Sequence, residues 1–128
     1  MITSLSTDLL IRLKNGYLAS RKTVSAPNSK FNRSILDILK KHNFIDTYEV
    51  SEDKKSLKIS LKYQNLIPKI SHVALFSKPG RRFYQKSTSL PWGKTQNSLI
   101  IISTSSGLMS QKEAKVKGLG GEIIAEIF

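Results

Sequence analysis

The sequence predicts an α+β fold made of two small lobes, one that combines helices with a sheet and one that is mainly β with a short helix. Apolar residues recur at helical spacing in two segments near the N-terminus, and an alternating strand pattern follows them. An apolar run near residue 100 has the length of a buried strand. With 128 residues, 39% of them hydrophobic, the chain can bury a core. We place the N-terminal α/β lobe at 1–64 and the C-terminal β-rich lobe at 65–128.

The N-terminal lobe is predicted to begin with a helix from Ser4 to Leu18, with Ser4 as its N-cap. One apolar stripe supports this helix, because its residues recur every four positions. The stripe consists of Leu5, Leu9, Leu13 and Tyr17, with Leu10 beside them. Asn15-Gly16 can supply a left-handed turn near the end of the helix, so the position of the C-terminus stays open.

The rest of this lobe is predicted as β-α-β-β. A short strand at 23–26 ends at Pro27, and Asn28 or Ser29 then caps a second helix that runs to about residue 43. The stripe of this helix consists of Phe31, Ile35, Ile38, Leu39 and His42. Two antiparallel strands follow at 44–50 and 57–61, and the second alternates apolar and polar residues as a half-exposed strand does.

The C-terminal lobe is predicted to follow a linker at 64–68. Strands are expected at 70–76, 82–85, 99–104 and 123–128, with a Pro-Gly turn at 78–81 and a bend at 90–93. A short helix lies before the last strand. Ser110 and Glu113 form the capping box that begins this helix, and Gly118 stands where a left-handed C-cap ends it.

The charge of the chain points to a phosphate-rich partner. It has 21 Lys and Arg against 9 Asp and Glu, a formal net charge of +12. No carboxylate side chain occurs between Asp53 and Glu113, an interval that holds eleven basic residues. The alternative is a soluble surface rich in lysine, but such a surface normally intersperses both signs of charge.

Several classes of protein are disfavoured. Absence of cysteine excludes disulfides, thiol catalysis and zinc ribbons. His42 and His72 lack neighbouring metal ligands, and no set of side chains resembles a catalytic centre, so we expect no enzyme, no cofactor, no metal and no small-molecule substrate. No run approaches a membrane span, and the N-terminus lacks the pattern of a signal peptide. We therefore expect a protein that works where it is made, away from membranes.

The segment Ser103–Ser110 is the most informative one. It follows the apolar run at 99–102 and precedes the short helix, so we expect a strand-to-helix turn that carries hydroxyl groups and Gly107. Hydroxyls donate and accept, and glycine admits close approach of another backbone, so this turn can contact a polyanion such as folded RNA. Glu122 begins the last strand. It either orients this turn through hydrogen bonds or is an ordinary charge at a strand end.

These motifs together resemble the eighth protein of the small ribosomal subunit, a family of RNA-binding proteins. The C-terminal signature is the most specific part: Ser103-Thr104-Ser105, Gly107, Met109, Glu113-Ala114, Gly118 and Gly120-Gly121-Glu122. Segments 8–15, 29–45 and 77–84 also resemble the first helix, the second helix with its following strand, and the Pro-Gly turn of that family. The match covers nearly the whole chain in order.

The resemblance implies a non-enzymatic ribosomal protein with two lobes. It implies direct binding to an irregular site in a helix of small-subunit rRNA, in the central domain, with the fifth and second small-subunit proteins as neighbours. It also implies a place in the ribosome, of a bacterial cytoplasm or an organelle, and a regulatory role on messenger RNA remains open. The RNA-binding residues expected on this basis are Ser103, Thr104, Ser105, Gly107, Tyr84, Lys78, Arg81, Arg82, Lys30 and Asn15, with Glu122 in an orienting role.

The chain also departs from the family pattern. Gln96-Asn97-Ser98 stands where a Gly-Leu-Gly stretch is common, and position 81 is Arg where an apolar residue is common. Two other functions stay open at this stage. A sequence-tolerant binder of single strands would use exposed aromatics, for which Phe76, Phe83, Tyr84 and Trp92 are the available cluster. A small hydrolase would need a catalytic set that the sequence does not offer.

Overall fold

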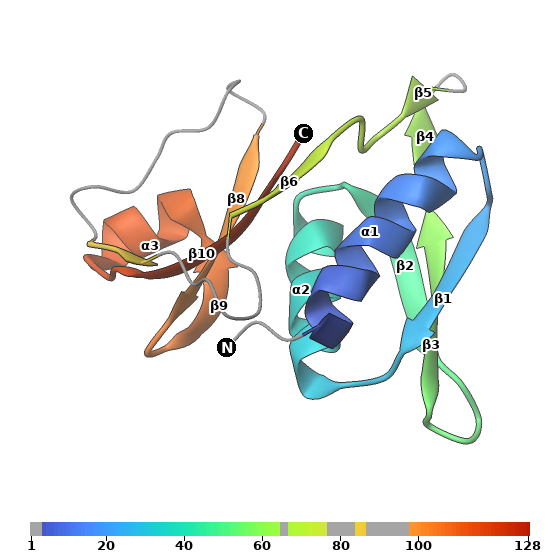
Figure 1. Ribbon diagram of the computed structural model, residues 1–128, viewed down its shortest axis with the longest axis horizontal. Coiled ribbons are helices and arrows are strands. Elements are labelled where there is room, and N and C mark those ends of the chain that lie inside the picture. The colour runs from blue at the N-terminus through green and yellow to red at the C-terminus, as the bar shows by residue number, and fades with distance from the viewer. Residues whose placement is uncertain (1–3, 65–66, 77–83, 87–97) are drawn as a thin grey trace. The chain divides into compact units, whose positions relative to one another are not determined.

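A computed structural model gives the fold, and it describes residues 4–64, 67–76, 84–86 and 98–128 (Figure 1). The chain divides into two compact units, Leu5–His72 and Val73–Phe128, which we describe separately. The first unit carries helices on an antiparallel sheet, and the second is mainly β with one short helix among its described residues. The predicted α+β class is therefore confirmed.

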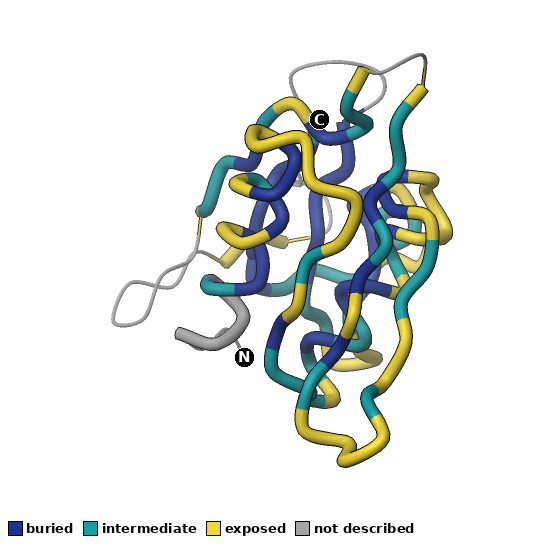
Figure 2. The backbone as a smooth tube through the Cα atoms, turned by 90° about the vertical axis from the view of Figure 1, so that its right-hand side faces the viewer, coloured by how far each residue is buried: buried dark blue, intermediate teal, exposed yellow. Residues whose placement is uncertain are grey.

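The unit Leu5–His72 has the predicted order of its first five elements. These are α1 (Ser4–Leu18), β1 (Thr23–Pro27), α2 (Lys30–Lys41), β2 (Ile45–Val50) and β3 (Ser56–Leu61). The strands form an antiparallel sheet in the order β1-β3-β2. Leu57 and Ile59 of β3 are fully buried whereas Lys58 between them is exposed, so the alternation in the sequence marks a covered face and a solvent face. Figure 1 shows the helices on one side of the sheet, and Figure 2 shows exposed and buried residues alternating along its strands.

The end of α1 differs from the prediction. Gly16 does not form a left-handed turn, because the helix continues through it to Leu18 and the positive φ occurs at Ser20 instead. A side chain at position 16 would collide with Cγ2 of Val24, and it would come within 3.2 Å of Leu61 Cδ1. A larger residue at this position would therefore require the side chains of Val24 and Leu61 to shift.

Tyr17 ties three segments of this unit together. Its hydroxyl donates to the carbonyl oxygen of Phe44 (2.6 Å) and accepts from the backbone N–H of Lys62 (3.0 Å). Its ring meets the ring of Tyr63 edge to face, with the centroids 5.4 Å apart. Burial raises the pKa of Tyr17 to about 12, because the interior disfavours the phenolate.

The second helix begins as predicted, since Ser29 is its N-cap and accepts from the N–H of Asn32. Its predicted buried stripe is only partly right. Ile35 and Leu39 are buried as predicted, but His42 is the exposed C-cap, and the fully buried residues also include Asn32 and Leu36. The side-chain nitrogen of Asn32 donates to the carbonyl of Pro27 (3.0 Å), whereas its buried Oδ1 has no hydrogen-bond partner among the described residues.

The segment predicted as a linker forms a small hairpin instead. Residues Tyr63–Gln64 form β4 and Ile67–Pro68 form β5, which pair antiparallel with Tyr63 opposite Pro68. Strands of two residues are too short to show a period in the sequence, so only the pairing reveals them.

The unit Val73–Phe128 is built around one long strand, β10 (Gly121–Ile127). Around it lie β6 (Val73–Leu75), β7 (Tyr84–Gln85), β8 (Leu99–Thr104) and β9 (Gly107–Ser110), in the order β6-β10-β8-β9 with β7 also paired to β10. The strand predicted at 70–76 is therefore shorter, the strand predicted at 82–85 is described only at Tyr84–Gln85, and the turns predicted at 78–81 and 90–93 lie outside the described residues.

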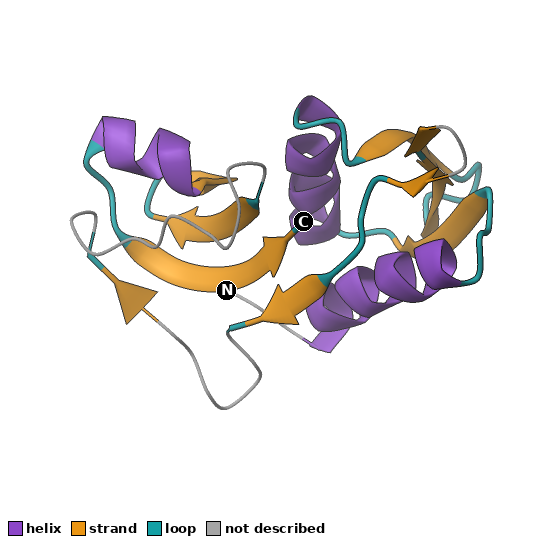
Figure 3. Ribbon diagram, turned by 90° about the horizontal axis from the view of Figure 1, so that it is seen from above, coloured by secondary structure: helices purple, strands orange, loops and turns teal. Residues whose placement is uncertain are grey.

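The short helix α3 (Gln111–Lys117) covers one face of this sheet (Figure 3). The core on that face contains Ile100, Ile102, Met109, Ala114 and Ile123. The predicted caps are present: Ser110 accepts from the N–H of Glu113, and Gly118 is left-handed with φ of 70°.

A β-bulge interrupts the pairing of β10 with β8. Ile123 pairs with Ile102 and Ala125 pairs with Ile101, so Ile124 is an extra residue without a partner position in β8. Glu122 lies before the bulge and Glu126 after it, and both are almost fully buried.

Candidate nucleic-acid interface

The segment Ser103–Ser110 is a β-hairpin rather than the predicted strand-to-helix turn. Ser103 and Thr104 end β8, Ser105 and Ser106 form the turn, and β9 returns to Ser110 before α3 begins. Strand β9 was not predicted because it has only four residues and runs directly into the N-cap of α3. The hydroxyls of Ser105 and Ser106 therefore lie at an exposed hairpin tip.

The hairpin turn explains the glycine in the motif. Gly107 has a φ of +108°, whereas Ser105 and Ser106 are not among the residues with positive φ. A hairpin in which the turn residues have negative φ needs a left-handed residue directly afterwards, and glycine adopts that conformation without strain. A side chain at position 107 would meet nothing within 4 Å. Glycine is therefore favoured here by its backbone conformation and not by lack of space.

Thr104 holds the turn in shape. Its hydroxyl donates to the carbonyl of Gly107 (2.8 Å) and accepts from the N–H of Ser106 (3.1 Å). This hydroxyl is therefore used inside the hairpin. The turn residues Ser105 and Ser106 remain exposed, so their hydroxyls can contact a ligand.

Three of the predicted site residues lie in one row across three neighbouring strands. Glu122 of β10 is opposite Tyr84 of β7 on one side and opposite Ser103 of β8 on the other. Directly opposed residues of antiparallel strands have their side chains on the same face. Because Ile102 and Ile123 belong to the core under α3, the row Tyr84–Glu122–Ser103 lies on the other face of the sheet.

The row combines an exposed ring with a buried carboxylate. Tyr84 is 64% exposed, Glu122 is 4% exposed and Ser103 is intermediate. The Glu122 carboxylate is therefore positioned between the Ser103 hydroxyl and the Tyr84 ring. It can orient these two groups for contact with a ligand. The prediction that Glu122 orients the turn stays a prediction.

Gly121 shapes this row, although the sequence indicated only a tight turn for it. A side chain at position 121 would collide with the backbone oxygen of Ser103, and it would lie 2.9 Å from the carbonyl carbon of that residue and 3.2 Å from Cα of Thr104. The glycine thus permits close approach of β10 to the end of β8, where the hairpin begins. Only the strand pairing could reveal this role.

The remaining predicted residues belong to the other unit or lie outside the described residues. Asn15 and Lys30 are exposed in the unit Leu5–His72, on α1 and at the first position of α2. Lys78, Arg81 and Arg82 lie outside the described residues. Within the described ranges, no group of three or more His, Asp or Glu side chains could hold a metal ion, and no helix is long and apolar enough to cross a membrane.

Comparison with known proteins places the chain in a family. The model of the family "Ribosomal protein S8" matches residues 5–128. The small ribosomal subunit protein uS8 of Nitratidesulfovibrio vulgaris is 43% identical over 130 residues, which cover all of both chains. The uS8 proteins of Corynebacterium efficiens and Erythrobacter litoralis are 41% and 39% identical, over 94% of both chains in each case. This chain therefore belongs to the ribosomal protein S8 family.

Proposed function

We propose that this protein is a structural, non-enzymatic component of the small ribosomal subunit that binds directly to a helix of small-subunit rRNA in its central domain and helps the subunit assemble. The chain belongs to a family of small-subunit ribosomal proteins, which supports the structural role. The observation that carries direct RNA binding is the row Tyr84–Glu122–Ser103 beside an exposed serine turn.

The chemistry of this surface suits an irregular RNA helix. A regular A-form helix hides base edges in its deep major groove, but it displays 2′-hydroxyls in the minor groove and bases at distortions. Hydroxyls of Ser103 and Ser105 can donate to and accept from such groups. The exposed ring of Tyr84 offers a stacking surface for a base that has left its stack. Glu122 repels phosphate, so it favours the approach of a sugar or base edge at this point.

Cationic side chains then provide affinity without sequence preference. The formal charge of +12 attracts the RNA backbone, and Lys30, Lys78, Arg81 and Arg82 are the proposed phosphate contacts. The cationic side chains thus position the protein on the RNA backbone. The hairpin and the row Tyr84–Glu122–Ser103 recognise the specific RNA site.

The proposal extends to partners and location. The fifth and second small-subunit proteins are the expected neighbours, and the ribosome of a bacterial cytoplasm or an organelle is the expected place of work. A messenger RNA that imitates the rRNA site would bind the same surface, which would give the protein a regulatory role. Crosslinking followed by sequencing of the bound RNA in cells tests both, because it identifies each RNA and the residue that contacts it.

The site itself is tested by affinity for a central-domain rRNA fragment against an unrelated duplex. We expect Ser105→Ala to weaken specific binding by about 0.5–1.5 kcal/mol, the value of one hydrogen bond. Tyr84→Leu should cost about 1–3 kcal/mol if the ring stacks on a base. Ser60→Ala on β3 is the matched control, since it removes a hydroxyl outside the site. Full preference for the rRNA fragment in both site variants would refute the assignment.

Binding of single strands without sequence preference is the second candidate. Phe76 and Tyr84 are the exposed aromatics of the proposed cluster among the described residues. Competition between a structured rRNA fragment and a homopolymer separates the two functions. A homopolymer that displaces the fragment at equal concentration would favour the second candidate.

A further inference from the structure

Strand β2 forms an open edge of the sheet in the unit Leu5–His72. It pairs with β3 on one side, and among the described residues no strand pairs with it on the other. A sheet edge of this kind carries unpaired backbone N–H and C=O groups, so it can pair with another chain. The hairpin site described above lies in the other unit and does not include this edge.

The backbone groups of Tyr48 and Val50 point toward the open edge. The N–H of Ser51, directly after β2, donates to the carbonyl of Ser56 on β3 (2.9 Å). Backbone groups alternate in direction along an antiparallel strand, so Glu49 turns its N–H and C=O toward β3, and its two neighbours turn theirs away. These four outward groups have no backbone partner in the part of the chain that the structure describes.

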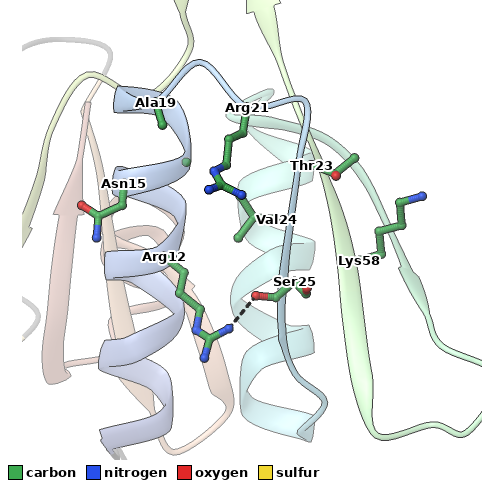
Figure 4. A pocket seen from close by; sticks show the side chains of 9 residues that line it. Arg12, Asn15, Ala19, Arg21, Thr23, Val24, Ser25 and Lys58 are labelled. Atoms are coloured by element: carbon green, nitrogen blue, oxygen red, sulfur yellow. Dashed lines mark hydrogen bonds between the residues drawn. The ribbon is translucent and has the colours of Figure 1, made fainter.

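The opposite edge of the sheet, formed by β1, is partly occupied. Arg12 of α1 donates to the carbonyl of Ser25 (3.0 Å), as the dashed line in Figure 4 shows. Pro27, the last residue of β1, has no N–H to offer. Strand β2 contains neither proline nor lysine, two residues that commonly protect an edge from pairing, and Val50 at its end is 42% exposed. The edge of β2 is therefore the one that remains open to a further strand.

Acidic side chains surround this edge in a chain that is otherwise strongly basic. Five of the nine Asp and Glu residues lie between positions 37 and 53, and all five are exposed: Asp37, Asp46, Glu49, Glu52 and Asp53. Two of them hold the fold together, since Asp37 accepts from the hydroxyl of Tyr48 (2.5 Å) and Asp53 accepts from the N–H of Lys55 (3.0 Å). The other three form no ion pair with the described residues.

These carboxylates suit neither a metal ion nor an RNA backbone. Within the described ranges, no group of three or more could hold a metal ion, and carboxylates repel phosphate. The nearby lysines do not neutralise the edge. Asn28, just after β1, donates to the carbonyls of Lys54 and Lys55 (2.8 and 3.0 Å), which holds that part of the turn on the β1 side. Lys58 lies opposite Glu49 on β3, but these two described residues form no ion pair.

We propose that β2 is a docking edge for a basic, extended segment of a neighbouring protein, which adds to the sheet as a further strand. Residues of that segment opposite Thr47 and Glu49 would lie on the solvent face, where Lys or Arg can pair with the carboxylate. Residues opposite Tyr48 and Val50 would lie on the helix face, where apolar side chains can cover Val50. The segment should therefore alternate basic and apolar residues along 47–50, up to the bulge at Asp46.

Charge also selects against a second copy of this chain. Two β2 edges paired with each other would bring their carboxylates close together, which is destabilising. The inference rests on the proposed place in the small subunit, because neighbours that bind the same RNA must themselves carry basic segments. It adds a protein contact to the RNA contact of the hairpin.

Amide exchange measured by NMR on the full chain, with a synthetic peptide of alternating Lys and Val, tests this edge. The amides of Tyr48 and Val50 should exchange more slowly when the peptide binds. Glu49→Gln should weaken peptide binding about two- to fivefold, because it removes one cross-strand charge pair. Thr23→Lys on β1 is the matched control, since it changes the net charge by the same amount at the opposite edge, and it should leave the affinity nearly unchanged.

Two further measurements test the backbone pairing itself. Val50→Pro removes an N–H that faces the open edge and not β3, so thermal unfolding should change little while peptide affinity falls about tenfold. A peptide N-methylated at alternate residues, on the amides that would face β2, makes the same test without a change in the protein. It should bind about tenfold more weakly than the unmethylated peptide.

Several results would overturn the proposal. Equal binding of a peptide with Lys and Val in separate blocks would show diffuse attraction, and equal binding of the N-methylated peptide would exclude strand addition. Slower exchange of the same two amides with poly-U RNA, or with rising protein concentration alone, would assign the edge to RNA or to a second copy. Affinity for the rRNA fragment tests the proposed function separately, and Val50→Pro should leave it unchanged. Failure of the peptide alone would leave that function standing, whereas loss of rRNA binding alone would refute the function and not the edge.

Discussion

Substitution of Gly121 by alanine tests whether the contact between β10 and the end of β8 shapes the interface. The added methyl would collide with the carbonyl oxygen of Ser103, and the carbonyl carbon and Cα of Thr104 lie at 2.9 and 3.2 Å. All three are backbone atoms, so no side-chain rotation relieves the clash. The strands must separate at the pair Glu122–Ser103, which is the centre of the proposed row.

The size of the effect follows from this displacement. Real Cβ contacts below 3.0 Å are essentially never seen, so a backbone in a paired sheet must move. Overpacking of this kind costs about 1–3 kcal/mol. A chain of this length should then lose roughly 5–10 °C in Tm. Because Ser103 moves with the hairpin, affinity for the rRNA fragment should also fall, by at least the value of one hydrogen bond, about 0.5–1.5 kcal/mol.

Thermal unfolding and RNA affinity measured on the same preparations provide the assay. Gly118→Asn is the matched control, since position 118 is left-handed, open to solvent and compatible with asparagine. It should change Tm little and leave RNA binding unchanged. If Gly121→Ala melts like the parent protein and keeps full affinity, the two strands do not need this close approach, and the reasoning about the row fails.

Three further outcomes are expected. Leu9→Ala should cost about 2–5 kcal/mol by urea unfolding, because Leu9 is fully buried; an unchanged midpoint would show that the stripe of α1 is not core. The raised pKa of Tyr17, about 12 against 10 in the unfolded chain, means that the stability it contributes is intact below pH 10 and is lost between pH 10 and 12. Tyr17→Phe should remove that part of the alkaline loss, and a pH profile identical to that of the parent would contradict it. Replacement of Arg81 and Arg82 by Gln should lower the log-log salt slope of RNA binding by about 0.7–0.9 for each phosphate that the variant no longer neutralises, and a flat slope in the parent would refute electrostatic binding.

Local patterns predicted most of the fold. Alternation of buried Leu57 and Ile59 with exposed Lys58 identified β3, and the caps at Ser110 and Gly118 fixed both ends of α3. These features depend on neighbours in the sequence, where period and side-chain chemistry can be read directly. Short elements were missed, because a strand of two to four residues has no measurable period.

The arrangement of the site could be predicted only in part. The motif indicated that the hydroxyls and Gly107 belong to one segment, but the hairpin geometry depends on β9, which was not predicted because it runs directly into the helix cap. The row Tyr84–Glu122–Ser103 joins residues from three distant segments, so it exists only once the strand register is known.

The bulge in β10 means that the strand can lose a residue without a change in how its two ends pair with β8. Ile124 occupies no partner position in β8, so its deletion would leave Ile123 opposite Ile102 and Ala125 opposite Ile101. The cost would be one buried side chain and the hydrogen bond from the N–H of Phe76 to the carbonyl of Ile124, rather than a slipped register against β8. Loss of one residue at this point would therefore leave the half of the strand that carries Glu122 in its register with β8.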